Sequence, residues 1–103
     1  MAWQRLPVAT ALAAIAVCIG CHRPSAENGE ALFRKNCGGC HSMRADRVTD
    51  APVLRGYFAR VPQPGVAEVR RQIMDGGRSM PPFRKRLSGD DVDDLVAFLE
   101  SWR

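Results

Sequence analysis

Histidine and cysteine are scarce in this chain: its 103 residues include two histidines and four cysteines. After Cys21 the only cysteines are Cys37 and Cys40, and the two histidines are His22 and His41. A structural zinc site takes four ligands, usually as two pairs of cysteine or histidine residues. Because no second pair accompanies Cys37, Cys40 and His41, the ligand count disfavours a zinc site.

Strand signals are missing as well, since no segment alternates apolar and polar residues. A thiol–disulfide oxidoreductase carries its CxxC motif between a strand and a helix of an α/β sheet, so the lack of a strand before Cys37 disfavours that class of enzyme. The positive charge is modest, +4 for the whole chain, and forms no basic stripe. We therefore expect no nucleic-acid partner, whereas this charge suits an encounter with an acidic protein surface.

The one long apolar run lies at the N-terminus, where Arg5 precedes apolar residues 6–19. This order predicts an export signal over residues 1–20. Residues 17–21, VCIGC, resemble a bacterial lipoprotein box with cysteine where leucine is usual, so Cys21 is the predicted lipidation site. Ordinary cleavage and an uncleaved anchor are the alternatives. We expect residues 21–26 to be a short spacer, residues 27–103 to form the domain, and the mature protein to lie on the periplasmic side of a bacterial membrane.

Three segments of this domain have helical patterns. The first surrounds residues 31–33, with Asn28 as its predicted N-cap. The second has apolar residues at i, i+3 and i+7 from Val66 and ends at Gly76-Gly77. The third begins at Ser88, which forms a weak capping box with Asp91. Its apolar face consists of Val92, Leu95, Val96, Leu99 and Trp102, with Phe98 alongside. Residues 44–64 show no sustained period and are predicted to be irregular.

Residues 37–41 read CGGCH. Two cysteines at i and i+3 point both sulfurs the same way, and the histidine that follows projects beneath a ring held by them. This is the pattern of covalent c-type haem attachment, with Cys37 and Cys40 on the vinyl groups and His41 on the iron. A domain of about 80 residues buries little apolar surface unaided, and a haem would fill its centre. A plain disulfide between Cys37 and Cys40, with no haem, is the remaining alternative.

A histidine-ligated haem also needs its sixth coordination position assigned. Met80 is the predicted ligand because two prolines stiffen the segment that follows it, after Gly76-Gly77 let the chain turn. Met43 lies too close to His41 in the sequence to reach the opposite face of the ring. Met74 is better explained as a core residue of the second helix, and His22 lies in the spacer.

Residues 27–103 resemble a class I cytochrome c. Besides CGGCH, the matches are Gly29 and Phe33 in the first helix, Leu95 and Phe98 in the last, and residues 51–56 and 77–81. The resemblance implies an all-α cytochrome c fold, with three main helices and long loops wrapped around one covalently bound haem. It also implies that the Pro52 carbonyl accepts a hydrogen bond from His41 and that Leu54 packs on the porphyrin. Residues 57–65 have no clear counterpart in the family.

Ligation by His41 and Met80 would fill both axial positions, which leaves one-electron transfer as the chemistry. The sequence therefore predicts an electron carrier, not an enzyme, that passes electrons between membrane or periplasmic redox proteins with acidic docking surfaces. Arg84-Lys85-Arg86 follows the Met80 segment and is the candidate docking cluster, or else a solvated turn. The alternatives are a haem subunit of a dehydrogenase or other oxidoreductase complex, and a haem ligand sensor.

Overall fold

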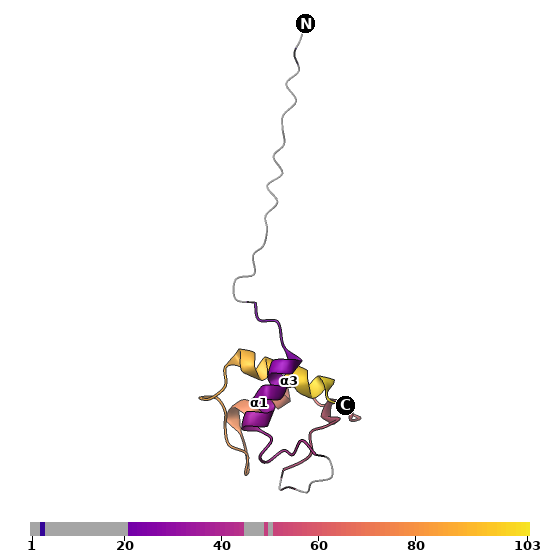
Figure 1. Cartoon of the computed structure of the whole chain (residues 1–103), viewed down its shortest axis with the longest axis vertical. Helices are drawn as coiled ribbons and strands as arrows, with labels where there is room; N and C mark the ends of the chain where they lie inside the picture. The colour runs from indigo at the N-terminus through magenta and orange to yellow at the C-terminus, as the bar shows by residue number, and fades with distance from the viewer. Residues whose placement is uncertain (1–2, 4–20, 45–48, 50) are drawn as a thin grey trace.

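The computed structural model describes residue 3, residues 21–44, residue 49 and residues 51–103. Three α-helices form the body of the molecule: α1 (Ala26–Asn36), α2 (Val66–Asp75) and α3 (Gly89–Ser101) (Figure 1). A 3-10 turn, η1 (Tyr57–Ala59), lies between α1 and α2. The described part contains no strand and only one isolated antiparallel bridge, between Gly77 and Met80. The predicted all-α fold with three helices and long connecting loops is confirmed.

The N-cap of helix α1 lies three residues before the predicted one. Ser25 is the N-cap, and its side chain accepts a hydrogen bond from the backbone N–H of Asn28 at 3.1 Å. The prediction of Asn28 as N-cap was wrong, because Asn28 lies inside the helix and its side-chain amide donates to Asp94 of α3 instead. Serine and asparagine are both favoured N-cap residues, so a local pattern does not distinguish the two candidates.

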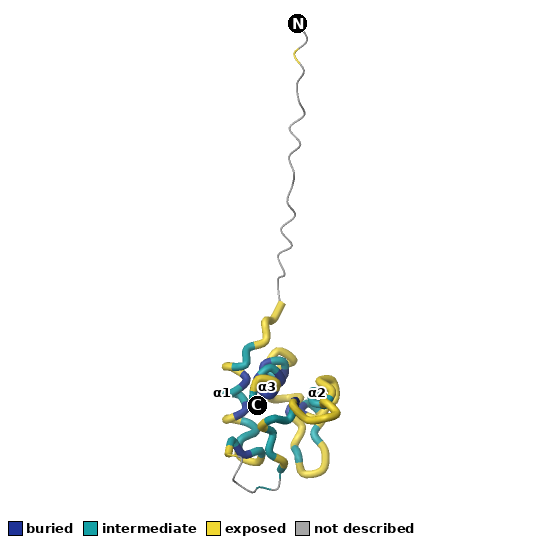
Figure 2. The backbone as a smooth tube through the Cα atoms, turned by 90° about the vertical axis from the view of Figure 1, so that its right-hand side faces the viewer, coloured by how far each residue is buried: buried dark blue, intermediate teal, exposed yellow. Residues whose placement is uncertain are grey.

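The crossing of α1 and α3 forms the centre of the molecule (Figure 1). Gly29 allows the close approach, since a Cβ atom at this position would lie 1.9 Å from the carbonyl oxygen of Asp94. Phe33 is 1% exposed and packs its ring against Phe98 and Trp102, with centroids 5.5 and 5.4 Å away. Buried residues gather where the two helices meet (Figure 2). The absence of a side chain at Gly29 therefore allows the two helices to approach closely enough for the aromatic side chains to pack.

Helix α3 begins and packs as predicted. Ser88 and Asp91 form a complete capping box, with each side chain accepting from the backbone N–H of the other. Five of the six predicted apolar residues are buried, and the sixth, Trp102, is partly buried at the C-cap. Gly56 donates its N–H to the carbonyl of Trp102 at 2.7 Å, so the end of α3 also holds the loop that precedes η1.

Helix α2 ends at Asp75 with Gly76 as its C-cap, as the glycine pair predicted. The chain then reverses and returns along α2, because Phe83 N–H bonds to the Ile73 carbonyl and Arg84 N–H to the Met74 carbonyl. Arg84 also forms an ion pair with Asp75. These contacts close residues 76–84 into a strap, which we call the Met80 strap, against the end of the helix.

The predicted export signal lies outside the described residues, apart from residue 3. Within the part of the chain that the structure describes, no helix is long and apolar enough to span a membrane. Cys21, at the start of the described domain, is exposed and is disulfide-bonded. Lipidation of Cys21 requires its thiol to be reduced, and it stays a prediction.

Candidate functional site

The CGGCH motif directly continues the end of α1. Cys37 is the C-cap, and its N–H bonds to the Phe33 carbonyl at 2.8 Å. The chain keeps turning after it, since the N–H groups of Cys40 and His41 both bond to the Cys37 carbonyl, at 3.1 and 2.8 Å. The end of the helix thus winds two thiols and an imidazole into a single turn, anchored on a fully buried phenylalanine.

The two motif cysteines are not disulfide-bonded. Cys37 is half-buried and Cys40 is exposed. Burial, and to a lesser extent the neighbouring Cys40, raises the pKa of the Cys37 thiol to about 11. Redox-active CxxC motifs lower the pKa of a cysteine so that it reacts as a thiolate. The environment of Cys37 does the opposite, which is a second argument against a thiol–disulfide oxidoreductase.

His41 is oriented by the loop that follows the motif. Its Nδ1 lies 2.8 Å from the carbonyl oxygen of Pro52, the contact that the resemblance implied. With Nδ1 donating to this carbonyl, the unprotonated Nε2 is the nitrogen left to bind a metal. The Thr49 hydroxyl lies within hydrogen-bonding distance of the carbonyls of Cys40 and Ala51, at 2.6 and 2.9 Å. It therefore joins the motif to the segment that contains Pro52, a role that sequence reasoning missed.

The Met80 strap is fixed by its backbone. Gly77 and Met80 exchange two hydrogen bonds, at 3.0 and 2.9 Å. Gly76 has φ 68° and ψ −163°, a region that is essentially restricted to glycine. A Cβ atom there would lie 2.5 Å from the Met80 carbonyl oxygen. Met80 is partly buried, and the side-chain amide of Gln72 donates to its sulfur at 3.7 Å. Nothing in the sequence had singled out Gln72.

Leu54 and the other methionines border the buried core. Leu54, Met43 and Met74 are each partly buried and pack against it. For Met74 this agrees with its interpretation as a core residue. The same border also includes Leu32, Tyr57 and Val69. Apolar side chains that are only partly covered supply the lining that a flat apolar cofactor requires.

The donor set fits a covalently held haem. It comprises two unbridged thiols one turn apart, an imidazole whose Nδ1 is engaged by a carbonyl, and a thioether on a braced strap. By contrast, the structure lends no support to a zinc site. Among the described residues, no three His, Cys, Asp or Glu side chains lie close enough to share a metal ion.

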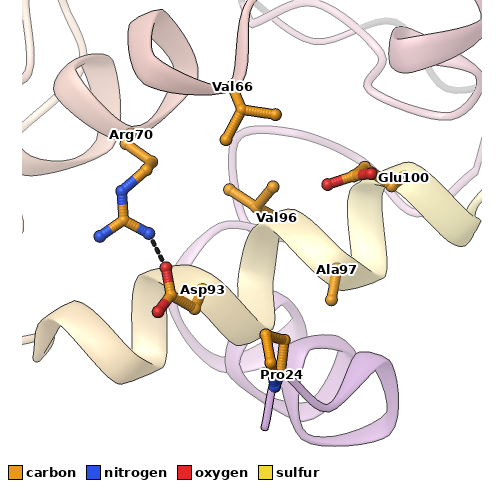
Figure 3. Close-up of a pocket in the computed structure, with 7 residues that line it drawn as sticks. All are labelled: Pro24, Val66, Arg70, Asp93, Val96, Ala97 and Glu100. Carbon is orange, nitrogen blue, oxygen red and sulfur yellow. Dashed lines mark hydrogen bonds and ion pairs between the residues drawn. The ribbon is translucent and has the colours of Figure 1, made fainter. Parts of the chain in front are cut away.

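A separate groove of about 280 Å³ lies between α2 and α3. Figure 3 shows Val66 and Val96 pointing toward one another across it, and Arg70 reaching from α2 to form an ion pair with Asp93 on α3. None of the predicted site residues lines this groove. The groove is therefore separate from the candidate site.

Comparison with known proteins gives a consistent result. Residues 24–99 match the family model for cytochrome c oxidase, cbb3-type, subunit III. The chain is 31% identical over 75 residues to cytochrome c6 from Synechocystis sp., which covers 70% of this chain and 61% of that protein. It is 33% identical over 75 residues to the cytochrome bc1 complex cytochrome c subunit of Corynebacterium efficiens, covering 71% of this chain but 24% of that protein.

A solved structure gives the same fold. The crystal structure of cytochrome c6 from the diatom Phaeodactylum tricornutum matches with a TM-score of 0.57 and 24% sequence identity. The match covers 75% of this chain and 92% of the diatom protein. At this level of identity the likeness establishes the helical architecture.

Proposed function

This chain belongs to the c-type cytochrome family, whose members bind haem c covalently, and on that premise we propose that it is a one-electron carrier. In this proposal the haem is attached through Cys37 and Cys40, and its iron is bound by His41 and Met80. The haem iron supplies the chemistry by taking up and releasing one electron. All further parts of the proposal concern what the residues of the chain do around it.

The observation that carries the proposal is the contact between His41 and Pro52. At 2.8 Å the Pro52 carbonyl holds the hydrogen on Nδ1, which fixes the tautomer and the plane of the imidazole ring. A histidine that is merely exposed on a surface has no need of such a partner. Because the adjacent cysteines are unbridged, this turn of the chain is suited to holding a porphyrin on one side and its iron on one nitrogen.

Met80 is proposed as the second iron ligand because its strap restrains it. The reciprocal bonds between Gly77 and Met80, and the steric fit of Gly76 beneath the Met80 carbonyl, define one position for the residue. Two protein ligands would leave no open coordination position for oxygen or carbon monoxide. A carrier needs this closure, whereas a ligand sensor or an enzyme that activates oxygen needs the opposite.

An absorption spectrum of the oxidised protein tests the ligand assignment. We expect the weak long-wavelength band of thioether-to-iron charge transfer, its loss in Met80→Ala, and rapid carbon monoxide binding only by the reduced variant. Met43→Leu and Met74→Leu are matched controls and should keep the band, because both methionines are proposed to be packing residues. Loss of the band in either control, or its persistence in Met80→Ala, would refute the assignment of Met80.

Redox protein partners with acidic surfaces remain the proposed electron donors and acceptors. The structure narrows the candidate docking cluster of residues 84–86, since Arg84 is paired with Asp75 and the Arg86 guanidinium lies 6.0 Å from the centroid of the Phe83 ring. Lys85 is exposed. Lys85→Glu should therefore slow electron transfer to an acidic partner at low ionic strength more than Arg84→Glu slows it. If Lys85→Glu slows electron transfer no more than Arg84→Glu does, Lys85 is not the main docking residue and the docking surface lies elsewhere.

A role inside a larger oxidoreductase complex is the second candidate function. It is favoured by the similarity to a bc1 complex cytochrome c subunit, of which this chain covers 24%. Native purification from membranes distinguishes the two, since a carrier should separate from large complexes in moderate salt whereas a subunit should not.

Export and lipidation of Cys21 complete the proposal. The mass of the intact protein from its native membranes would report haem, cleavage and acyl groups together. We expect the mass of one haem plus acyl chains on a chain that begins at Cys21. A chain that is cleaved but carries no acyl group, or that keeps Cys21 in a disulfide, would exclude lipidation without affecting the haem assignment.

A further inference from the structure

Asp94 is the most deeply buried acid among the described residues, with 2% of the residue exposed. It lies in the middle of α3, at the crossing with α1. Its Oδ1 accepts the backbone N–H of Ser25 at 2.8 Å and lies 2.6 Å from Nε2 of His22. Its Oδ2 accepts from the Asn28 side chain at 2.6 Å. All three partners come from residues 22–28, which lead from Cys21 into α1.

These contacts show that the predicted spacer packs on the domain. Ser25 and Asn28 are neutral donors that do not titrate. His22 differs because it lies one residue after Cys21, outside the helix, and because its contact with Asp94 depends on a titratable ring. The outermost contact of the set is therefore also the one that responds to pH.

We propose that His22 and Asp94 form a pH-sensitive latch, which holds residues 22–25 against α3 when His22 is protonated and loosens them when it is neutral. The latch controls how firmly the domain is held to the chain segment around Cys21. The latch does not depend on the haem ligands or on lipidation, so it can be tested independently of the proposed function.

Three acids of α3 around His22 favour the protonated ring. Besides Asp94, the carboxylate of Asp90 lies 3.9 Å from Nδ1 of His22, and Asp91 is near enough to attract it. All three acids belong to α3, and the other partners of Asp94, Ser25 and Asn28, are uncharged. The hydrogen bond to Asp94, followed by attraction to these acids, raises the pKa of His22 above 6.5, although desolvation acts in the opposite direction.

The direction of the pH response follows from the two groups. Burial alone would raise the pKa of Asp94, but the hydrogen bonds from Ser25, Asn28 and His22 lower it below 3.8. Asp94 is therefore ionised across the neutral range. Because the pKa of His22 is raised, its contribution is complete below 6.5 and is lost as the pH rises through the higher, folded-state value. The latch thus opens on the alkaline side.

Nuclear magnetic resonance of the reduced, haem-loaded protein tests the latch. The ring shifts of His22 report its titration, and the hydrogen-exchange protection of the Ser25 amide reports whether the segment stays docked. We expect the pKa of His22 to lie above 6.5 and the Ser25 protection factor to fall about twofold to tenfold across the same transition, as for the loss of one hydrogen bond. A His22 that titrates at or below its ordinary value would overturn the proposal, as would a Ser25 amide whose protection does not change.

Two variants and one control separate the latch from general destabilisation. In Asp94→Asn the pKa of His22 should return toward 6.5, and the protection of the Ser25 amide should no longer vary with the titration of His22. His22→Gln, which leaves the buried acid in place, should make the protection of Ser25 independent of pH and serves if Asp94→Asn does not fold. Asp93→Asn is the control, because Asp93 pairs with Arg70 on the adjacent face of α3 and should leave His22 unchanged. A pH-dependent Ser25 in His22→Gln would contradict the proposal.

Discussion

The two halves of the domain are completed in different ways. Where α1 crosses α3, backbone meets backbone at Gly29, three aromatic rings pack together, and the buried acid Asp94 has a partner for each oxygen. On the side of the motif and the Met80 strap, several apolar residues, among them Leu54, Met43 and Met80, are only partly covered, and the chain is held mainly by backbone hydrogen bonds. The side chains of the first region bury one another, whereas those of the second form a partly exposed lining that a cofactor could cover.

This difference indicates where the stability of the protein originates. The crossing buries its side chains against one another, so its energy resides in the polypeptide. The lining contributes little to the free energy of folding until an apolar group covers Leu54, Met80 and their neighbours. Substitutions in the first region should therefore affect folding with or without the cofactor, whereas those in the second should act on the cofactor environment.

The largest effect is expected from Gly29→Val. Its Cβ would meet the carbonyl oxygen and carbon of Asp94 at 1.9 and 2.5 Å. Both are backbone atoms of a packed helix and cannot move aside cheaply, so we expect a loss of about 4 kcal/mol or more, or no folded protein. Denaturant unfolding measures this loss. Gly65→Ala is the control, since its Cβ would only reach Glu68 Cγ at 3.8 Å. Similar stability of the two variants would refute the close crossing.

Removal of the buried carboxylate in Asp94→Ala should have the next largest effect. It leaves the N–H of Ser25 and the amide of Asn28 without their acceptor, at a cost of about 2–4 kcal/mol. The variant should also lose an acid-sensitive part of its stability. In the native protein the contribution of Asp94 is present above 3.8 and is lost as the pH falls through its lowered pKa. Asp93→Ala removes only a half-exposed ion pair and should cost about 0–1 kcal/mol.

Gly76→Ala should act mainly on the second region. Its Cβ would press on the Met80 carbonyl at 2.5 Å, and the backbone conformation of Gly76 also disfavours any side chain, so we expect a cost of about 1–3 kcal/mol. The charge-transfer band of the oxidised protein should weaken with it, as Met80 is displaced. Gly56→Ala also has positive φ, 72°, but nothing lies within 4 Å of its Cβ. Gly56→Ala should lose stability while keeping the charge-transfer band. If Gly76→Ala also keeps the band, the conformation of the strap does not determine iron binding by Met80.

The smallest effect is expected from Gln72→Leu. The amide of Gln72 donates to the Met80 sulfur. If Met80 binds the iron as proposed, this hydrogen bond would withdraw electron density from the sulfur and favour reduced iron. Its removal should lower the reduction potential by about 20–60 mV, the equivalent of one weak hydrogen bond for a one-electron couple. Voltammetry measures the change. The exposed Gln63→Leu should leave the potential unchanged, and a potential in Gln72→Leu equal to the native value would show that the contact has no electronic role.

Sequence reasoning succeeded where a feature is local. The Ser88 capping box, the end of α2 at Gly76 and the apolar face of α3 are all encoded within a few residues, and all are confirmed. The family resemblance singled out Gly29, which lies where α1 crosses α3, and implied the His41–Pro52 contact; both features connect distant segments. Lipidation of Cys21 and iron binding by Met80 stay predictions.

Sequence reasoning failed where the role of a residue depends on a partner that is distant in the sequence. Ser25 and Asn28 are equivalent candidates for a cap until Asp94 takes the side chain of Asn28. Asp94 itself is one of four acids between residues 90 and 94, where acids at the start of a helix are unremarkable. Its burial follows only from the angle at which α1 crosses. Gln72 likewise acquires its contact from the return of the strap.

The unfolding of the chain made without haem attachment tests the division between the two regions most directly. The protein would be produced in a host that lacks the attachment machinery, and its thermal unfolding would be followed by far-ultraviolet circular dichroism beside the haem-loaded form. We predict that the colourless chain keeps some helix but melts gradually, because the lining has nothing to cover it. A sharp, cooperative transition in the colourless chain, matching that of the haem-loaded protein, would contradict the account.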